Sequence, residues 1–189
     1  MKNNDTIVKT DDQPTRLLWV DVETTGLDPM RDDLLEIGLL CTTPDLEPMD
    51  DGYHSVIRHV GPVDGFIQRM HGPNGLLGEC RAKDARDGFT VMLEARDYIQ
   101  TQLDAEYRLI PAGSSVNFDR RFLDANMPGL LDGCSHRSFD VSVLYEAIRM
   151  WNPEKLPDTV KTTDHRVMHC LKDSLAYAQA YRRLLCSMR

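Results

Sequence analysis

Residues 17–26 read Leu-Leu-Trp-Val-Asp-Val-Glu-Thr-Thr-Gly, an apolar run that leads directly into an acidic pair. A short apolar run that ends at a turn signal is typical of a buried strand. Side chains at i and i+2 of a strand point to the same face, so Asp21 and Glu23 project together. Two neighbouring carboxylates at the end of a buried strand repel each other and resist desolvation. Closely spaced oxygen ligands suit Mg²⁺ or Mn²⁺; the alternative is an exposed, solvated pair without a function.

The size and charge of the chain limit its domain organisation and its partners. A chain of 189 residues is long enough for one hydrophobic core and short for two. Residues 1–14 are polar and cannot bury apolar surface, so we expect a disordered tail there and a single domain over 15–189. The net charge of −8 argues against a protein that coats long nucleic acid. It does not exclude a small nucleotide substrate, because bound metal ions can invert the local field.

The cysteines and the apolar runs bear on the compartment. The five cysteines are odd in number and show no CxxC spacing, which indicates a reducing compartment rather than a disulfide framework or a zinc site. The first residues lack the apolar core of a signal peptide, and no apolar run reaches membrane-spanning length. We therefore expect a cytoplasmic protein without a membrane segment.

The remaining pattern predicts an α/β domain with a mixed sheet. Strands are expected at 16–22, 34–41 and 53–59, as an antiparallel meander, and at 109–113 and 138–141. A helical turn is expected around 63–70, with loop for the rest of 61–78. Further helices are expected at 89–103, 119–126, 143–151 and 164–185, with Ser142 as the cap of the third. The last helix carries its apolar residues on one face, namely Val167, Met168, Leu171, Leu175, Ala178, Tyr181 and Leu185.

Four short segments carry the residues suited to chemistry: the Asp-x-Glu pair, residues 114–123 (Ser-Ser-Val-Asn-Phe-Asp-Arg-Arg-Phe-Leu), residues 139–142 (Phe-Asp-Val-Ser) and residues 165–168 (His-Arg-Val-Met). Together they resemble the DEDDh branch of the 3′→5′ exonucleases, and within it the oligoribonuclease family. The resemblance covers nearly the whole chain, from residue 17 to about 185. It implies a ribonuclease H-like mixed central sheet flanked by helices. It also implies a homodimeric exoribonuclease that uses Mg²⁺ or Mn²⁺ at a two-metal site and degrades short oligonucleotides, chiefly 5′-phosphorylated dinucleotides, to mononucleotides.

The resemblance also implies roles for individual residues at the reacting phosphate. Asp21, Glu23 and Asp119 match the metal-binding carboxylates, and His165 matches the general base that takes a proton from the attacking water. A histidine suits that task because its pKa lies near neutrality. The alternatives are a histidine at a helix start without a role and, for Asp119, an ordinary acid in the first turn of a helix.

Substrate-binding residues can be placed in the same way. Ser115, Arg137 and Ser142 match a cap for the 5′ phosphate, since arginine donates to two phosphate oxygens together. His136 stands where the family has a tyrosine that reaches into the partner's pocket. For the bases, the resemblance implies contacts with Leu27 and Phe66. Stacking of a base on an aromatic side chain such as Phe66 tolerates any sequence. A core role for Phe66 is the alternative.

Cys170 departs from the family pattern. Five residues after the histidine the family has a second acid that binds metal, and here the residue is a cysteine. A thiol is a poor ligand for a hard cation, and a thiolate prefers softer metals. Asp173 one turn further on could supply the carboxylate, the site could function with three acids, or the change could disable catalysis. A soft-metal site with Cys170 and His169 is a fourth account.

These accounts leave three hypotheses for the function. The first is the exoribonuclease that the resemblance implies. The second is a catalytically silent protein that binds short oligonucleotides. The third is a proofreading-type DNA exonuclease, which would trim long single strands faster than dinucleotides.

Overall fold

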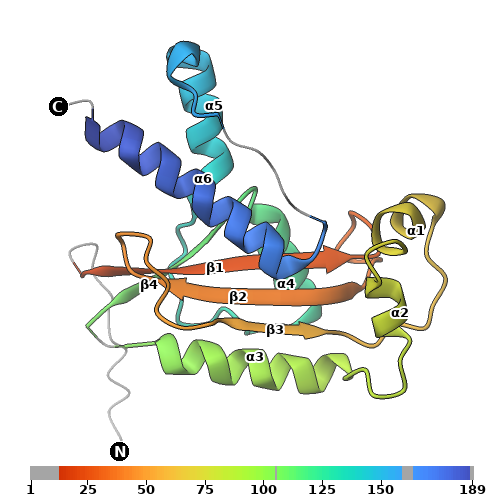
Figure 1. Ribbon diagram of the computed structural model, residues 1–189. Coiled ribbons are helices and arrows are strands. Elements are labelled where there is room, and N and C mark those ends of the chain that lie inside the picture. The colour runs from red at the N-terminus through yellow and green to blue at the C-terminus, as the bar shows by residue number, and fades with distance from the viewer. Residues whose placement is uncertain (1–12, 105, 159–163, 188–189) are drawn as a thin grey trace, which may run out of the picture.

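The structure is a computed structural model that describes residues 13–104, 106–158 and 164–187. Residues 1–12 of the expected tail lie outside the described residues. Five strands form one mixed sheet in the order β3-β2-β1-β4-β5 (Figure 1). Strands β1 to β3 are antiparallel neighbours, and β4 and β5 continue the sheet in parallel with β1. The α/β class, the mixed sheet and the antiparallel meander are therefore confirmed. The strands are β1 (Thr15–Thr24), β2 (Leu34–Thr42), β3 (Tyr53–Val56), β4 (Arg108–Gly113) and β5 (Phe139–Asp140).

Strand β1 is the central strand and is covered on both faces. Its alternate apolar residues belong to two different core clusters, Leu18 and Val20 to one and Leu17 and Trp19 to the other. This two-sided burial explains why the sequence shows an unbroken apolar run rather than alternation. The Trp19 Nε1 group donates to Thr42 Oγ1 at 2.9 Å, so the buried indole is satisfied.

Helices cover each face of the sheet. Helices α3 (Gly88–Gln102) and α4 (Asn117–Asn126) pack on one face, and α5 (Val141–Trp151) and α6 (Val167–Ser187) pack on the other. Figure 1 shows α5 and the C-terminal end of α6 extending away from the sheet. Within the described ranges, no helix has the length and apolar character needed to cross a bilayer.

Helix α6 lies directly against β2 because Gly38 has no side chain. A Cβ atom at Gly38 would meet Val167 at 2.8 Å and Leu171 at 3.1 Å, which is closer than side chains tolerate. Gly38 pairs with Asp21 on β1. The first turn of α6 is thereby held beside the acidic end of β1.

Two expectations about local elements are wrong. The rest of 61–78 was expected to be loop after α1 (Gly65–His71), but a second short helix, α2 (Leu76–Cys80), begins within it. Its buried residues Leu76, Leu77 and Cys80 pack with Leu35 of β2, so tertiary burial outweighs the local turn signals. Strand β3 is also shorter than expected, and a single turn of 3₁₀ helix follows α5 at Pro153–Lys155.

The expected starts of α4, α5 and α6 are also wrong, and α4 begins at Asn117 rather than at 119. Asp140, not Ser142, caps α5, because the Asp140 carboxylate accepts a hydrogen bond from the Ser142 amide at 2.9 Å. Helix α6 begins at Val167 rather than at 164, so His165 precedes the helix, with a φ of 60°. The expected apolar face of α6 is buried over most of its length, but Leu185 is 52% exposed.

Candidate active site

Two acids from β1 and one thiol from α6 form the centre of the site. Asp21, Glu23 and Cys170 each offer a donor atom, and these atoms lie within 4.8 Å of one another. The Cys170 Sγ atom is 3.8 Å from Glu23 Oε1. Among the described residues, this group does not include Asp173. The geometry therefore gives no support to the account in which Asp173 supplies the carboxylate that Cys170 replaces.

Asp119 approaches the acidic pair from α4. It lies in the first turn of that helix, it is 4% exposed, and its Oδ1 atom accepts a hydrogen bond from the Val22 amide at 3.0 Å. Val22 stands between Asp21 and Glu23, so the three acids meet at the end of β1. Asp119 is outside the 4.8 Å group but near enough for its charge to raise the pKa values of Asp21 and Glu23.

The buried carboxylates destabilise each other's charged forms. Burial, followed by the charges of Asp119, Glu23 and Glu36, raises the pKa of Asp21 well above its usual range. Burial and then the charge of Glu36 raise the pKa of Glu23 to about 8, and burial raises the pKa of Asp119 to about 7. The Asp21 Oδ2 atom is buried and has no hydrogen-bond partner in the described chain. An orphaned carboxylate oxygen among neighbouring acids fits a divalent cation, whereas the sulfur of Cys170 does not suit a hard one.

His71 is a site residue that the sequence analysis missed. It is 1% exposed, and its Nε2 atom lies 3.3 Å from Glu23 Oε2. Burial, with the charges of His165 and Arg166, lowers the pKa of His71 to about 4, so the ring is neutral at pH 7. Its Nε2–H group can donate to Glu23 when that carboxylate is ionised. The Nδ1 atom is buried without a hydrogen-bond partner among the described residues. The spacing of His71 from the other motifs gave no signal of this contact.

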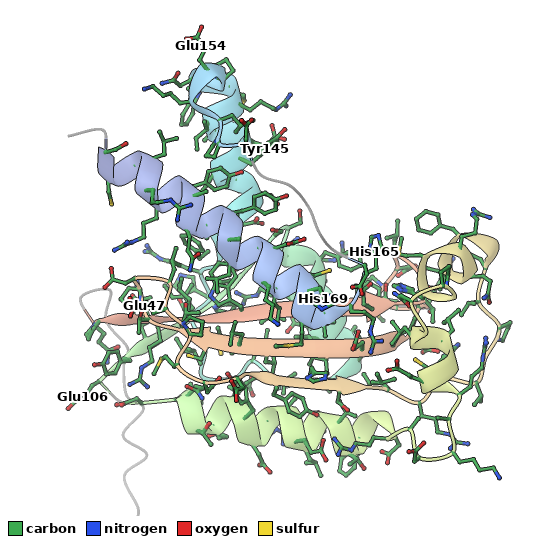
Figure 2. All side chains as sticks on the ribbon, in the orientation of Figure 1. Glu47, Glu106, Tyr145, Glu154, His165 and His169 are labelled. Carbon is green, nitrogen blue, oxygen red and sulfur yellow. The ribbon has the colours of Figure 1, made fainter. Side chains whose placement is uncertain are left out.

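His165 lies in an exposed position just before α6 (Figure 2). Its ring centroid is 6.3 Å from that of His71, in an edge-on arrangement. Asn74 fixes the backbone here, because its Nδ2 atom donates to the carbonyl oxygens of Asp164 and His165, both at 2.9 Å. The left-handed backbone at His165 is therefore held from the segment between α1 and α2.

Arg166 anchors the same segment to the sheet. Its guanidinium contacts Glu36 of β2 at 2.9 Å and Glu79 of α2 at 2.8 Å. Glu36 is 1% exposed and also accepts from the Val167 amide. A signal for this network was present in the sequence, since an acid inside the apolar strand of residues 34–41 requires a buried partner.

Ser115 and Ser142 come together, as expected for two residues of one subsite. The Asp140 Oδ1 atom accepts from both serine amides at 2.9 Å, and the two Oγ atoms are 3.2 Å apart. Ser115 has a φ of 56°. The two serines line a cavity of about 440 Å³ together with Tyr145 and Tyr177.

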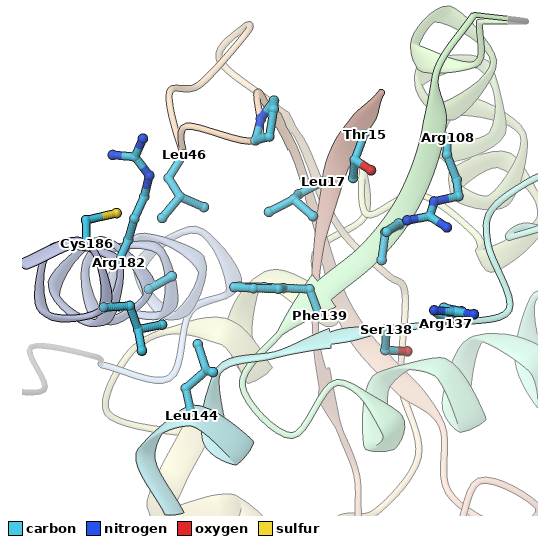
Figure 3. A pocket seen from close by; sticks show the side chains of 14 residues that line it. Thr15, Leu17, Leu46, Arg108, Arg137, Ser138, Phe139, Leu144, Arg182 and Cys186 are labelled. Carbon is cyan, nitrogen blue, oxygen red and sulfur yellow. The ribbon is translucent and has the colours of Figure 1, made fainter. Parts of the chain in front are cut away.

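The structure does not bring Arg137 into that cavity. Arg137 lines a different cavity, of about 570 Å³, with Arg108 and Ser138 near it and Arg182 on the opposite wall (Figure 3). Its neighbour His136 is exposed. The roles of these two residues stay predictions.

The two residues expected to bind bases are both on the surface. Leu27 follows β1 and is 80% exposed, and Phe66 on α1 is 56% exposed. The alternative of Phe66 as a core residue is therefore wrong. Both side chains are accessible to a base.

A five-stranded mixed sheet with carboxylates gathered at the end of its central strand is the arrangement of the ribonuclease H-like fold. A sequence model of the exonuclease family (RNase_T) matches residues 18–181, and the chain belongs to that family. This assignment confirms the resemblance seen in the motifs and the enzyme class that it implies.

Among curated relatives, the chain is 32% identical over 178 residues to a protein of Shewanella loihica named Oligoribonuclease, covering 89% of this chain and 94% of the relative. It is 34% identical over 176 residues to an Oligoribonuclease of Tropheryma whipplei, covering 89% and 92%. Among solved structures, exonuclease I of Methylocaldum szegediense superposes with a TM-score of 0.67 at 16% identity, covering 89% of this chain and 40% of that one. A zinc-bound complex of E. coli exonuclease I with single-stranded DNA gives 0.67 at 14% identity, covering 91% and 41%. The chain thus spans about 40% of those two proteins, and this likeness concerns the fold alone.

Proposed function

We propose that this chain is a metal-dependent 3′→5′ exoribonuclease that cleaves short oligonucleotides, chiefly 5′-phosphorylated dinucleotides, to mononucleotides. Its family, and relatives named Oligoribonuclease along nearly their whole length, support this activity. The observation that carries it is the approach of Asp119 to the end of β1, beside Asp21 and Glu23, where the Asp21 Oδ2 atom is buried without a hydrogen-bond partner in the described chain. Residues 15–189 would form the exonuclease domain. No disulfide joins the five cysteines in the described chain, which agrees with a cytoplasmic location.

The three carboxylates would hold the cations, Mg²⁺ or Mn²⁺. Bound divalent ions supply Lewis-acid activation of the scissile phosphate and lower the pKa of a bound water. The contribution of His165 is to accept the proton of the attacking water on a ring nitrogen and to release it to solvent, which reaches the exposed ring. His71 orients Glu23 by donating its Nε2–H group.

The substrate would lie between α1 and the serine cavity. Leu27 and Phe66 offer apolar surface on which bases stack without sequence preference. The hydroxyl groups of Ser115 and Ser142 donate to the 5′ phosphate. Arg137, whose side chain lines the neighbouring cavity, would have to turn toward the serines to add its charge to that cap. A cap that recognises a terminal phosphate favours substrates of two nucleotides over long strands.

A second copy of the chain is the proposed partner. His136 stands where the family has an aromatic residue that reaches across the dimer. The helix that follows, α5, exposes Val143, Met150 and Trp151, of which Trp151 is 81% exposed. Large exposed apolar patches mark interaction surfaces.

The activity is tested by a time course on 5′-phosphorylated dinucleotide with Mn²⁺, in which this chain is compared with Cys170→Asp. We expect mononucleotide product from the variant, and from the chain itself at a lower rate. A longer single strand of DNA serves as the competing substrate for the proofreading alternative. If neither protein cleaves the dinucleotide, the proposal is wrong.

Cys170 favours a second candidate, a silent binder of short 5′-phosphorylated oligonucleotides. The thiol occupies the place of an acid among the metal ligands. This candidate predicts binding that is lost in Arg137→Ala, without turnover in any divalent metal. Binding measured by calorimetry, together with the time course, separates the two functions.

A further inference from the structure

We propose that Cys170 is itself a metal ligand, so that the acidic site of this chain selects thiophilic divalent cations of the Zn²⁺, Co²⁺ and Cd²⁺ class over Mg²⁺. The location rests on the proposed function, because the same acids would hold the catalytic cations. The binding chemistry can nevertheless be measured without any substrate. The inference concerns the choice of metal and not the identity of the reaction.

The fold delivers the thiol to the acids by backbone packing. Residues Val167, Cys170, Leu171 and Ser174 follow helical spacing, and the other three are buried. Cys170 therefore lies on the side of α6 that faces the sheet. Since Gly38 lets this turn of α6 approach β2 closely, the sulfur comes to 3.8 Å from Glu23 Oε1.

The donor set is that of a site for a borderline or soft cation. Two carboxylates and one sulfur, with donor atoms within 4.8 Å of one another, can supply three protein ligands. Three protein ligands with an open fourth position are typical of catalytic zinc sites. Mg²⁺ instead demands octahedral oxygen ligands and binds thiols poorly. Asp21 belongs to this group, and its Oδ2 atom is buried without a hydrogen-bond partner in the described chain.

His169 is not part of this donor set. Its Nδ1 atom is 2.8 Å from Asp164 Oδ1, on the exposed side of the helix start. The soft-metal account with Cys170 and His169 is thus replaced by one with Cys170, Asp21 and Glu23. On binding, the Cys170 thiol loses its proton to solvent, and the sulfur lone pair forms the bond to the cation.

Cobalt spectroscopy tests the ligand directly. The folded full-length chain is titrated with Co²⁺, and absorption from sulfur-to-cobalt charge transfer is recorded in the near ultraviolet. We expect this band to saturate at one Co²⁺ per chain, to vanish in Cys170→Ser and to weaken in Asp21→Asn. Cys186→Ser is the matched control, because Cys186 is exposed at the far end of α6. We expect the charge-transfer band of this variant to be unchanged.

Metal selectivity gives a second measurement. Calorimetry with Cd²⁺ and Mg²⁺ should show that Cys170→Asp lowers the ratio of Cd²⁺ to Mg²⁺ affinity at least about tenfold, since even residues that only support metal ligands change affinity about 10–100-fold. A band that is absent, or that persists in Cys170→Ser, overturns the inference, and so does an unchanged ratio. Circular dichroism verifies that each variant is folded. A cobalt band without dinucleotide cleavage would refute the proposed function and leave this inference intact. Dinucleotide cleavage without a cobalt band would refute this inference and leave the proposed function intact.

Discussion

Glu23 has two close neighbours of different chemical character, the imidazole of His71 at 3.3 Å and the thiol of Cys170 at 3.8 Å. His71 is buried and neutral at pH 7, so once a bound cation keeps Glu23 ionised, the Nε2–H group can stabilise the Glu23 carboxylate by hydrogen bonding and not through charge. A neutral donor orients a metal ligand without competing with the cation for its charge.

Replacement of His71 by leucine should therefore weaken metal binding. We expect an affinity loss of about 10–100-fold in His71→Leu, because Glu23 loses the donor that orients it. Calorimetry with Mn²⁺ measures the change. His54→Leu is the control, since His54 is exposed on β3; equal affinities in the two variants would contradict the role given to His71.

The raised carboxylate pKa values predict how stability depends on pH without metal. Glu23 has a pKa of about 8 in the folded protein, against 4.5 as the usual value. Between these values the folded state binds more protons than the unfolded state, so the free energy of unfolding falls as the pH rises. His71, whose pKa is lowered from 6.5 to about 4, has the opposite effect, but only below pH 6.5.

The pH range in which Glu23 acts on stability without the opposing effect of His71 is thus 6.5 to about 8. We expect urea denaturation of the metal-free protein to show stability that decreases with pH across this window, and Glu23→Gln to flatten the slope. Saturating Mn²⁺ should also remove the decrease of stability with pH, because the bound cation keeps the acids ionised. A flat profile for the metal-free chain would show that these carboxylates titrate normally.

Single residues could be predicted where a local periodicity or a family motif identifies them. Asp21 and Glu23 followed from strand alternation, and Ser115 and Ser142 from the resemblance. His71 could not be found, because its contact with Glu23 depends on how α1 packs against β1. Arg137 illustrates the opposite case, in which a motif suggests a role but the side chain lines another cavity.

At the scale of elements, Arg166 connects the start of α6 with β2 and α2. Removing one partner of a buried ion pair leaves an uncompensated charge, and the cost is about 3–5 kcal/mol. We expect a loss of this size in Arg166→Met, with Glu36 left in the core. Chemical denaturation measures it.

The matched control for that variant is Arg149→Met. Arg149 pairs with Glu146 on the exposed side of α5, and exposed pairs contribute only about 0–1 kcal/mol. Equal losses in the two variants would show that the Glu36 pair is not a structural anchor. A lower rate of turnover in Arg166→Met, at unchanged KM, would reflect the displaced His165.

The contact between α6 and β2 gives a further prediction. A methyl group at Gly38 would meet Val167 at 2.8 Å, so Gly38→Ala should destabilise the protein by about 1–3 kcal/mol through overpacking. Thermal unfolding measures the change. Gly78→Ala is the control, because no atom lies within 4 Å of a Cβ at that helical position; similar melting temperatures would contradict the close packing.

Helices and strands were easier to predict from the sequence when their apolar pattern was long or regular. Strands β1 and β2 carry long apolar runs, and α6 carries a clear apolar helical face. Helix α2 was missed because three buried residues among glycines and prolines form too short a pattern. The start of α6 was misplaced because the conformation of His165 is fixed from Asn74, a contact remote in sequence.

On the scale of the whole molecule, the projecting part formed by α5 and the end of α6 exposes several large apolar side chains, among them Met150, Trp151 and Leu185. We expect the chain to be a dimer in solution and the double variant Met150→Glu with Trp151→Glu to be a monomer, because charge at an apolar interface is costly. Light scattering measures the mass. Phe89→Glu is the control, since Phe89 is 66% exposed on α3; a monomeric parent chain would refute the dimer.

The position of β1 has a consequence for the behaviour of the acids. The strand has a neighbour on each edge and a packed layer on each side, so Asp21 and Glu23 cannot separate unless the sheet itself opens. Backbone amides at such positions exchange with deuterium only through global unfolding. Because the scaffold prevents the carboxylates from relaxing, their repulsion persists in the native state, and a cation that relieves it should raise the melting temperature of the entire molecule.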